Sequence, residues 1–295
     1  MFNRLLSSRT FLPQIGNVEN EDAMLPAVSI KTNFNDISSQ ADLHGLSLVD
    51  YVPKDPQRRA VAEFLRTTSS MFMMGHEFRH ISAGHCNYYE NNFRFNSISE
   101  KQERDSTSAT IPMERQAMER QAMEWDADTF SFYELLNSRF ESSKAIVANK
   151  NASEYHEFYS NPQQIFLLSV LACAGFFRVI DYLDHPTSDW PHLSHPPSRN
   201  RRVSLLIEGS LMAKSLYPDE FGDETVDNLQ GLYINEMEIN SVMLWNTSHD
   251  NSMKNMNHID IKDHHIKIIK SWDSIVDVLG RYSYTQLKKF PLHVK

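Results

Sequence analysis

The apolar positions of this chain recur mostly at the spacing of an α-helix. Within residues 57–84, apolar residues recur at helical spacings, and His76 and His80 continue the pattern; the apolar residues are Val61, Phe64, Leu65, Phe72 and Met73. A glycine close to the end of this stretch is a suitable C-cap. The pattern therefore predicts one long helix over 57–84.

Further helices are predicted downstream. Residues 113–140 hold strong helix formers and neither Gly nor Pro, which indicates a second long helix. Helical patterns also occupy 162–183 and 203–216, and residues 266–282 are weakly helical. The stretch 87–112 is rich in Asn, Ser and Thr, which predicts a loop.

Only the N-terminal part of the chain shows the alternation that is typical of strands. Residues 27–34 and 45–52 alternate loosely, which predicts two strands or a hairpin. We therefore predict a mainly α-helical fold of the α+β class. The expected organisation is an N-terminal region over 1–56, a core over 57–215 and a C-terminal accessory region over 216–295, although one domain can also account for the pattern.

The most apolar stretch, residues 165–177, is shorter than the roughly 20 residues that cross a membrane, so a buried core helix is expected. The formal charge is −9 and no long Lys/Arg run occurs, which argues against a nucleic-acid partner. The chain has two cysteines, Cys86 and Cys173, which argues against a disulfide framework and favours a reducing compartment. We therefore expect a cytoplasmic protein, with a buried Cys86 thiol.

The candidate chemistry begins at His76-Glu77-Phe78-Arg79-His80, an H-E-x-x-H pattern. Two histidines four residues apart share a helix face and can bind one zinc ion. Glu77 follows the first histidine and can take the proton of a water that zinc has made more acidic. The pattern predicts a hydrolytic zinc site that requires a third protein ligand.

Two positions compete for the third ligand. His85 is five residues beyond His80, which turns it about 140° away on a helix. The elongated pattern H-E-x-x-H-x-x-G-x-x-H also fails, because Ala83 and Cys86 occupy its glycine and histidine positions. We therefore favour Glu124 on the next predicted helix, and expect His85 at a helix end or behind a ligand.

Three further residues are candidates for supporting roles. Asp128 is one turn beyond Glu124 and can orient a ligand imidazole through its second ring nitrogen. In the stretch HPPSRNR, Arg201 can pair with a carboxylate such as Asp128 or bind substrate. His195, with His192 as the weaker alternative, can act in catalysis by stabilising an oxyanion. A rigid connector with solvent-facing charges explains the same stretch equally well.

Together these motifs resemble the gluzincin class of zinc peptidases. E-x-D-A-D at 124–128 and H-P-P-x-x-x-R at 195–201 look like those of the CAAX prenyl protease and HtpX family. The G-H that follows H-E-x-x-H, the chain length and the lack of membrane spans look more like the Lit phage-exclusion peptidase family. The resemblance is confined to motifs within about residues 60–210.

The resemblance implies a helical zincin-like metallopeptidase core. It implies zinc ligands at His76, His80 and Glu124, a catalytic Glu77 and a supporting Asp128. Arg79 departs from the resemblance, because small residues are usual at that position in these families.

The predicted function is a zinc-dependent endopeptidase that cleaves a protein or peptide substrate, with a role in phage exclusion or host defence as an extension of the resemblance. The alternative is a catalytically inactive zincin-like protein that acts as a binding or regulatory module, and Arg79 is the feature that favours it. A separate cluster of C-terminal histidines, His249, His258, His264 and His265, matches no tight metal site and is expected to be solvated.

Overall fold

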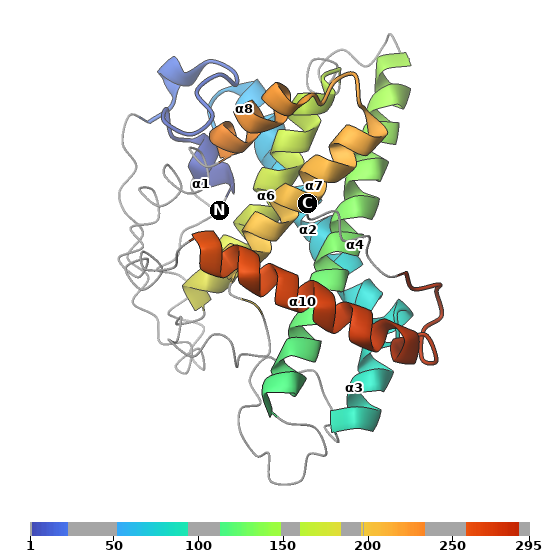
Figure 1. Cartoon of the computed structure of the whole chain (residues 1–295). Coiled ribbons are helices and arrows are strands. Elements are labelled where there is room, and N and C mark those ends of the chain that lie inside the picture. Colours follow the sequence, from blue (N-terminus) through green and yellow to red (C-terminus); the bar gives the residue numbers. More distant parts are fainter. Residues whose placement is uncertain are drawn as a thin grey trace. The chain divides into compact units, whose positions relative to one another are not determined.

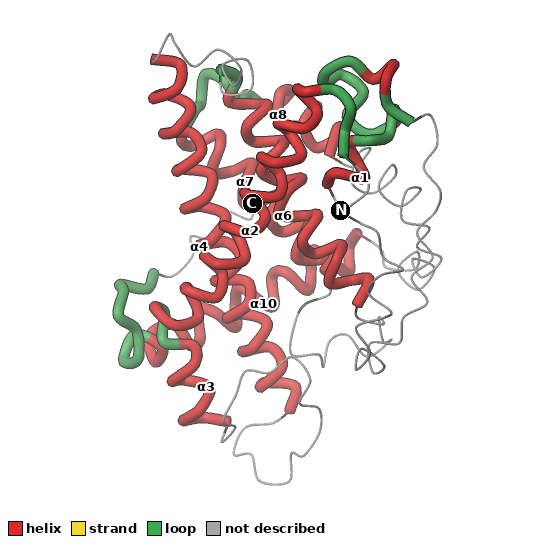
Figure 2. The backbone as a smooth tube through the Cα atoms, turned by 180° about the vertical axis from the view of Figure 1, so that it is seen from behind, coloured by secondary structure: helices red, strands yellow, loops and turns green. Residues whose placement is uncertain are grey.

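The computed structural model describes residues 2–22, 52–93, 113–148, 160–183, 196, 198–233 and 258–288. Over these ranges the chain is mainly helical, and no strand forms apart from an isolated bridge between Ser8 and Asp22 (Figure 2). The prediction of a mainly helical protein is confirmed. The hairpin predicted for 27–34 and 45–52 lies outside the described residues, except for Val52, which is in no strand.

The helices of the described ranges are labelled in Figure 1. They are α1 (Phe2–Leu6), the 3-10 helix η1 (Val18–Asn20), α2 (Pro56–Ser82), α3 (His85–Phe93), α4 (Met113–Ala148), α6 (Pro162–Leu183), α7 (Ser198–Leu216), α8 (Asp223–Tyr233) and α10 (His258–Leu279). All five predicted helices are present. The loop prediction over 87–112 is wrong at its start, because α3 extends to Phe93.

The chain divides into two compact units, and each is assembled from three separate stretches. The first unit comprises Met1–Met71, Leu136–His185 and Gly209–Asp250. The second unit comprises Phe72–Leu135, Pro186–Glu208 and Asn251–Lys295. All the candidate site residues belong to the second unit.

The most apolar stretch of the chain lies in α6 of the first unit and is buried, as predicted. No helix in the described part of the chain is long and apolar enough to cross a membrane.

The guanidinium of Arg58 is fully buried and fixes the N-terminal segment of the first unit. It donates hydrogen bonds of 2.7–2.9 Å to the backbone carbonyls of Leu6, Ser8, Phe11, Leu12 and Ile15.

The core of the second unit forms between α3, α4 and α10. Buried apolar residues of α10 recur every three or four positions, so that one face of this helix packs inward. The cluster comprises Ile268, Ile269, Trp272, Ile275, Val276 and Leu279 of α10, Ala122, Met123 and Trp125 of α4, and Tyr88 and Tyr89 of α3.

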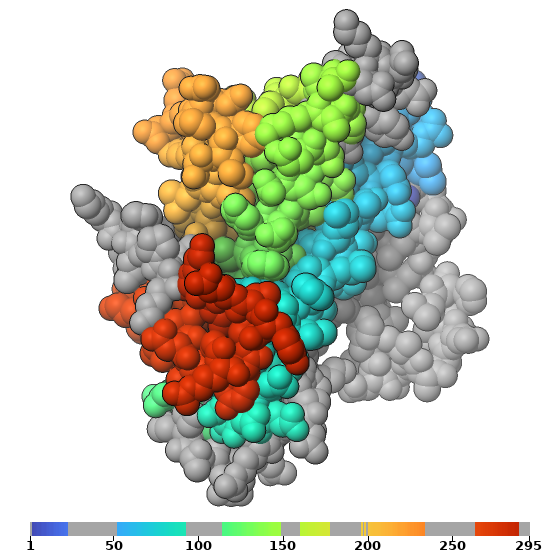
Figure 3. Space-filling view, turned by 90° about the vertical axis from the view of Figure 1, so that its right-hand side faces the viewer, coloured from blue at the N-terminus to red at the C-terminus, as the bar shows by residue number. Residues whose placement is uncertain are grey.

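The residues after α10 hold the turn between α2 and α3. Gly84 has a φ of +77°, and a Cβ there would lie 2.5 Å from the Tyr282 carbonyl oxygen. The Tyr284 amide donates a 2.9 Å hydrogen bond to the Ser82 carbonyl, and Figure 3 shows the C-terminal segment against α2 and α3. Only glycine combines this φ with this close approach, so the turn that starts α3 depends on Gly84.

Two predictions about exposure are corrected here. His264 is 4% exposed rather than solvated, and its Nε2 lies 2.6 Å from the Gln121 side-chain oxygen. Burial lowers the pKa of His264 to about 4, so this ring is neutral in the core. The prediction of a buried Cys86 is wrong: Cys86 is exposed, Cys173 is buried, and both are free thiols. His249 lies outside the described residues.

Candidate metal centre

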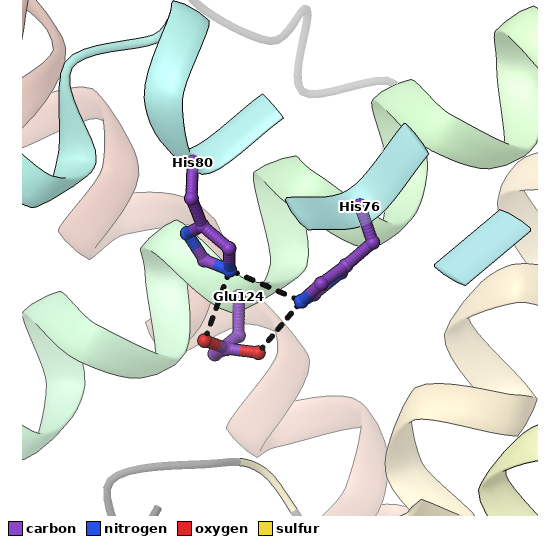
Figure 4. Close-up of side chains that lie close together, drawn as sticks. All are labelled: His76, His80 and Glu124. Carbon is purple, nitrogen blue, oxygen red and sulfur yellow. Dashed lines mark hydrogen bonds and ion pairs between the residues drawn. The ribbon is translucent and has the colours of Figure 1, made fainter. Parts of the chain in front are cut away.

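Helices α2 and α4 bring three side chains with ligand atoms together. His76 and His80 project from successive turns of α2, and Glu124 projects from α4 (Figure 4). The two Nε2 atoms are 3.0 Å apart, and the Glu124 oxygens lie 3.4 Å from His76 Nε2 and 3.3 Å from His80 Nε2. All three side chains are buried, so the sequence-predicted ligands meet at one point of the second unit.

The spacing of these atoms fits a small metal ion. Zinc binds nitrogen and oxygen at about 2.0–2.2 Å, which places neighbouring ligands of a tetrahedral site about 3.3 Å apart. The two nitrogens lie 3.0 Å apart, and each lies 3.3–3.4 Å from a different oxygen of the Glu124 carboxylate, so all three separations are close to this value. The cluster His76, His80 and Glu124 can therefore hold a metal ion, and the mixed nitrogen and oxygen donors suit zinc.

The close approach of α2 and α4 depends on Gly75. A Cβ at this position would lie 2.5 Å from the Ser131 Oγ atom, and that hydroxyl donates a 2.6 Å hydrogen bond to the Phe72 carbonyl. The distance between two packed helices is set by the side chains at their contact. Because residue 75 has no side chain, the next residue, His76, is brought within reach of Glu124.

His76 is supported by Asp128 and Arg201. The Oδ1 atom of Asp128 lies 2.9 Å from His76 Nδ1, and Arg201 donates two hydrogen bonds to Asp128, of 2.7 and 2.8 Å. Arg201 also lies 3.3 Å from a Glu124 oxygen. Asp128 therefore contacts the second ring nitrogen of His76, and Arg201 forms the pair with Asp128 that was one of its predicted options. The roles of both residues in a metal site stay predictions.

The charges around His76 perturb the pKa values of the pair. Burial raises the pKa of Asp128, but Arg201 and His76 outweigh it and hold the pKa below its ordinary value. Burial likewise lowers the pKa of His76, whereas Asp128 and Glu124 raise it to about 9. The metal-free centre therefore binds a proton on His76 at neutral pH.

Arg79 faces another carboxylate rather than the candidate ligands. Its guanidinium donates hydrogen bonds of 2.6 and 3.0 Å to Asp126 and one of 3.2 Å to the Thr285 hydroxyl. It also lies 4.2 Å from the centroid of the Phe130 ring. Arg79 is thus held in a buried ion pair with Asp126.

His85 lies behind His80. It is the first residue of α3, and its Nδ1 is 3.0 Å from His80 Nδ1, the nitrogen opposite the candidate metal position. Its Nε2 lies 3.4 Å from Asp126 Oδ2. Burial lowers the pKa of His85 despite the attraction of Asp126, which keeps this ring neutral at pH 7. The geometry agrees with the expectation that His85 supports a ligand instead of binding the metal.

The formal charges of this buried cluster leave room for a cation. Its three carboxylates are those of Glu124, Asp126 and Asp128, and its two guanidinium groups are those of Arg79 and Arg201. These five groups together carry one more negative than positive charge when all the imidazoles are neutral. A proton on His76 or a bound metal ion would offset that charge.

Of the two predicted catalytic residues, the structure describes Glu77 only. Glu77 is exposed on α2 directly after His76, and among the described residues it forms no ion pair. Its exposure leaves the carboxylate accessible to a substrate or water molecule. His195 lies outside the described residues, so its role stays a prediction.

Sequence reasoning assigned no role to Asp126 or Asn200. Asp126 is two residues from Glu124, about 200° around the helix, and therefore does not share its face. Asn200 is 4% exposed, and neither polar atom of its side chain has a hydrogen-bond partner among the described residues. It lines a pocket that also touches Asp128 and Arg201, which makes it a place for an ordered water molecule.

Comparison with known proteins adds no relative. The chain matches no family model, and no significant match was found among curated proteins or solved structures. The gluzincin resemblance therefore stays a prediction from motifs, and the proposals below are argued from the residues and their geometry.

Proposed function

We propose that this protein is a zinc-dependent endopeptidase of the gluzincin type. The observation that carries the proposal is the buried triangle of side chains formed by His76, His80 and Glu124, in which the two nitrogens lie 3.0 Å apart and each lies 3.3–3.4 Å from one oxygen of the carboxylate, close enough to bind one zinc ion. Both histidines come from an H-E-x-x-H whose glutamate is exposed beside them. A role in phage exclusion extends this proposal and is supported by the Lit-like motif alone.

In this proposal each residue of the candidate centre has a distinct role. Zinc held by the triangle would supply a Lewis acid that polarises a peptide carbonyl and makes water more acidic. The Glu77 carboxylate accepts a proton from the attacking water and passes it to the leaving amine. Asp128 and Arg201 keep the His76 ring in its binding orientation.

The experiment that tests this function separates metal binding from proteolysis. Zinc content and cleavage of unfolded casein are measured for wild type, Glu77→Gln and the exposed control Glu134→Gln on α4. The proposal expects all three proteins to bind zinc, and only Glu77→Gln to lose cleavage, by about two orders of magnitude or more. Cleavage by Glu77→Gln at the wild-type rate would show that Glu77 is not the catalytic base.

A second candidate function is a zincin-like module that binds metal without catalysis. The observation that favours it is the burial of the ligands, since His76, His80 and Glu124 are only 5–6% exposed. A catalytic zinc needs an open coordination position, whereas a structural one is closed by protein ligands. A hydroxamate that changes the visible spectrum of the cobalt-substituted protein would favour the enzyme, and an unchanged spectrum would favour the module.

A further inference from the structure

A continuous series of contacts extends from His80 away from the candidate metal position. His85 contacts His80 through the two Nδ1 atoms, Asp126 contacts His85, and Arg79 holds Asp126. We propose that His85, Asp126 and Arg79 form a positioning relay that fixes His80 in the tautomer whose Nε2 lone pair is free for a metal ion. The inference rests only on the metal-binding part of the proposed function.

The directions of the hydrogen bonds follow from the far end of the series. The Arg79 guanidinium can only donate, and it donates to both oxygens of Asp126. The ionised carboxylate of Asp126 lies 3.4 Å from His85 Nε2, longer than an ordinary hydrogen bond, and its negative charge favours a hydrogen over a lone pair on that nitrogen. A neutral His85 then has a lone pair on Nδ1.

The same logic decides the state of His80. Its Nδ1 lies 3.0 Å from the Nδ1 of His85, so one of these two nitrogens must carry the hydrogen. Because His85 Nδ1 has a lone pair, His80 Nδ1 is the donor. A neutral His80 then has its own lone pair on Nε2, the atom that faces His76 and Glu124. A metal ion requires this lone pair, and the partner of the second ring nitrogen commonly sets it.

Burial makes each contact of the relay hard to replace. His80, His85, Asp126 and Arg79 are all less than 9% exposed, so water cannot readily replace a missing partner. The Thr285 hydroxyl and the face of the Phe130 ring hold the Arg79 guanidinium. The relay thus links the C-terminal segment to the second histidine of the H-E-x-x-H pattern.

The turn at Gly84 builds this arrangement. On a continuous helix His85 would point about 140° away from His80. The positive φ of Gly84 ends α2 and starts α3 at His85, which returns the His85 ring to His80. The H-I-S-A-G-H sequence therefore supplies a support for the ligand that precedes it.

The two histidines of α2 are supported by different groups. His76 contacts the charged carboxylate of Asp128 directly, whereas His80 contacts the neutral imidazole of His85, which Asp126 orients. A directly contacting carboxylate favours a charged ring, while the His85 relay selects one neutral tautomer. The relay residues are positioning residues, since none of them contacts the candidate metal position.

The test uses two substitutions of similar shape at His85. In His85→Asn the side-chain oxygen takes the place of Nδ1 and can accept the hydrogen of His80, whereas His85→Leu offers no acceptor. His264→Leu is the control, because His264 is a buried histidine of the same unit that bonds Gln121 instead of the centre. Folding of each variant is verified by its amide spectrum.

The first readout is the tautomer of His80, from nitrogen-15 spectra of the metal-free protein at about pH 8, above the ordinary histidine pKa of about 6.5. Hydrogen on Nδ1 of His80 and on Nε2 of His85 is expected in wild type and His264→Leu. His85→Asn should keep the His80 form, and His85→Leu should lose it. Hydrogen on His80 Nε2 in the wild type would overturn the relay.

The second readout is zinc affinity, from competition with a chromophoric chelator. His85→Leu should bind zinc about 10–100-fold more weakly, with His85→Asn and His264→Leu within about threefold of wild type. Equal affinities for His85→Leu and His85→Asn would reduce His85 to a packing residue and overturn the proposal. A wild type that binds no zinc but shows the expected tautomers would contradict the proposed function and support the relay.

Discussion

The Nδ1 atom of His76 lies 2.9 Å from the Oδ1 atom of Asp128, one helical turn beyond Glu124. A single face of α4 therefore supplies both a candidate ligand and the support of another ligand. Arg201 joins the two carboxylates, because it lies within 3.3 Å of each. The consequence is that metal binding, protonation and the position of α7 are connected at this point of the second unit.

Replacing Asp128 with Asn should weaken zinc binding about 10–100-fold, as is usual when the group behind a ligand is removed. The physical reason is that the charge that orients and polarises the His76 ring is lost. Competition with a chromophoric chelator measures the change, and Asp227→Asn on the exposed face of α8 is the matched control. A zinc affinity of Asp128→Asn equal to that of the wild type would show that Asp128 does not support the metal site.

The stability of the metal-free protein should fall as pH rises from about 6.5 to 9. The folded state holds the pKa of His76 at about 9, above the ordinary histidine value of 6.5. Because folding raises the pKa of His76, protonation of this residue stabilises the fold fully below pH 6.5, and this stabilisation disappears as the pH passes through 9. The shift corresponds to an effect on the order of 3 kcal/mol.

Urea unfolding of the chelator-treated protein at several pH values measures this dependence. His76→Asn is the control, and its curve should lack the decline that His76 causes in the wild type. Parallel curves for the two proteins over this pH range would contradict the raised pKa of His76.

Zinc binding at pH 7 should release about one proton from His76. A metal ion needs the lone pair of His76 Nε2, and a ring with a pKa of about 9 is protonated at this pH. Calorimetry in buffers with different ionisation enthalpies counts the protons released. The count should fall toward zero above pH 9, and a count of zero at pH 7 would contradict a charged His76 in the metal-free state.

Gly75→Ala should both destabilise the protein and weaken zinc binding. The added methyl group would approach the Ser131 hydroxyl to 2.5 Å, so α2 and α4 must separate or the 2.6 Å bond to Phe72 must break. We expect a loss of about 1–3 kcal/mol, typical of overpacking a close contact. Thermal unfolding and chelator competition measure both effects, and Gly231→Ala, which meets no neighbouring atom within 4 Å, is the control.

A Gly75→Ala protein with wild-type zinc affinity would show that the close approach of the two helices is not needed for the site. Because Gly231 lies on α8, the control also corrects for the general gain in helix propensity when Gly is replaced by Ala.

The sequence was sufficient for the long helices and the ligand triangle. Helical periodicity located α2 and α4, and the spacing of four residues paired His76 with His80 and Glu124 with Asp128. These predictions rest on local geometry, since residues four apart share a helix face whatever surrounds them. The same geometry argued against His85 as the third member, whereas the choice of Glu124 depended on the motif of the next predicted helix and on the family resemblance, because no local spacing indicates that α2 and α4 meet.

Features that depend on tertiary packing could not be predicted in this way. The helix α3 has an Asn-rich sequence of low helix propensity, and it forms where Tyr88 and Tyr89 pack into the core with α10. His264 seemed solvated because its neighbours are polar, but α10 buries it against Gln121. The pairing of Asp126 with Arg79 joins residues 47 positions apart, which no local pattern indicates.

The most direct test of the centre is the zinc affinity of the Glu124→Gln variant. Gln keeps the shape of Glu124 and removes its charge, and the matched control is Glu114→Gln at an exposed position on the same helix. Wild type and Glu114→Gln should each bind one zinc ion, and Glu124→Gln should bind it at least about 100-fold more weakly, because an anionic ligand is lost. Zinc held as tightly by Glu124→Gln as by the wild type would contradict the assignment of Glu124, and with it the proposed centre.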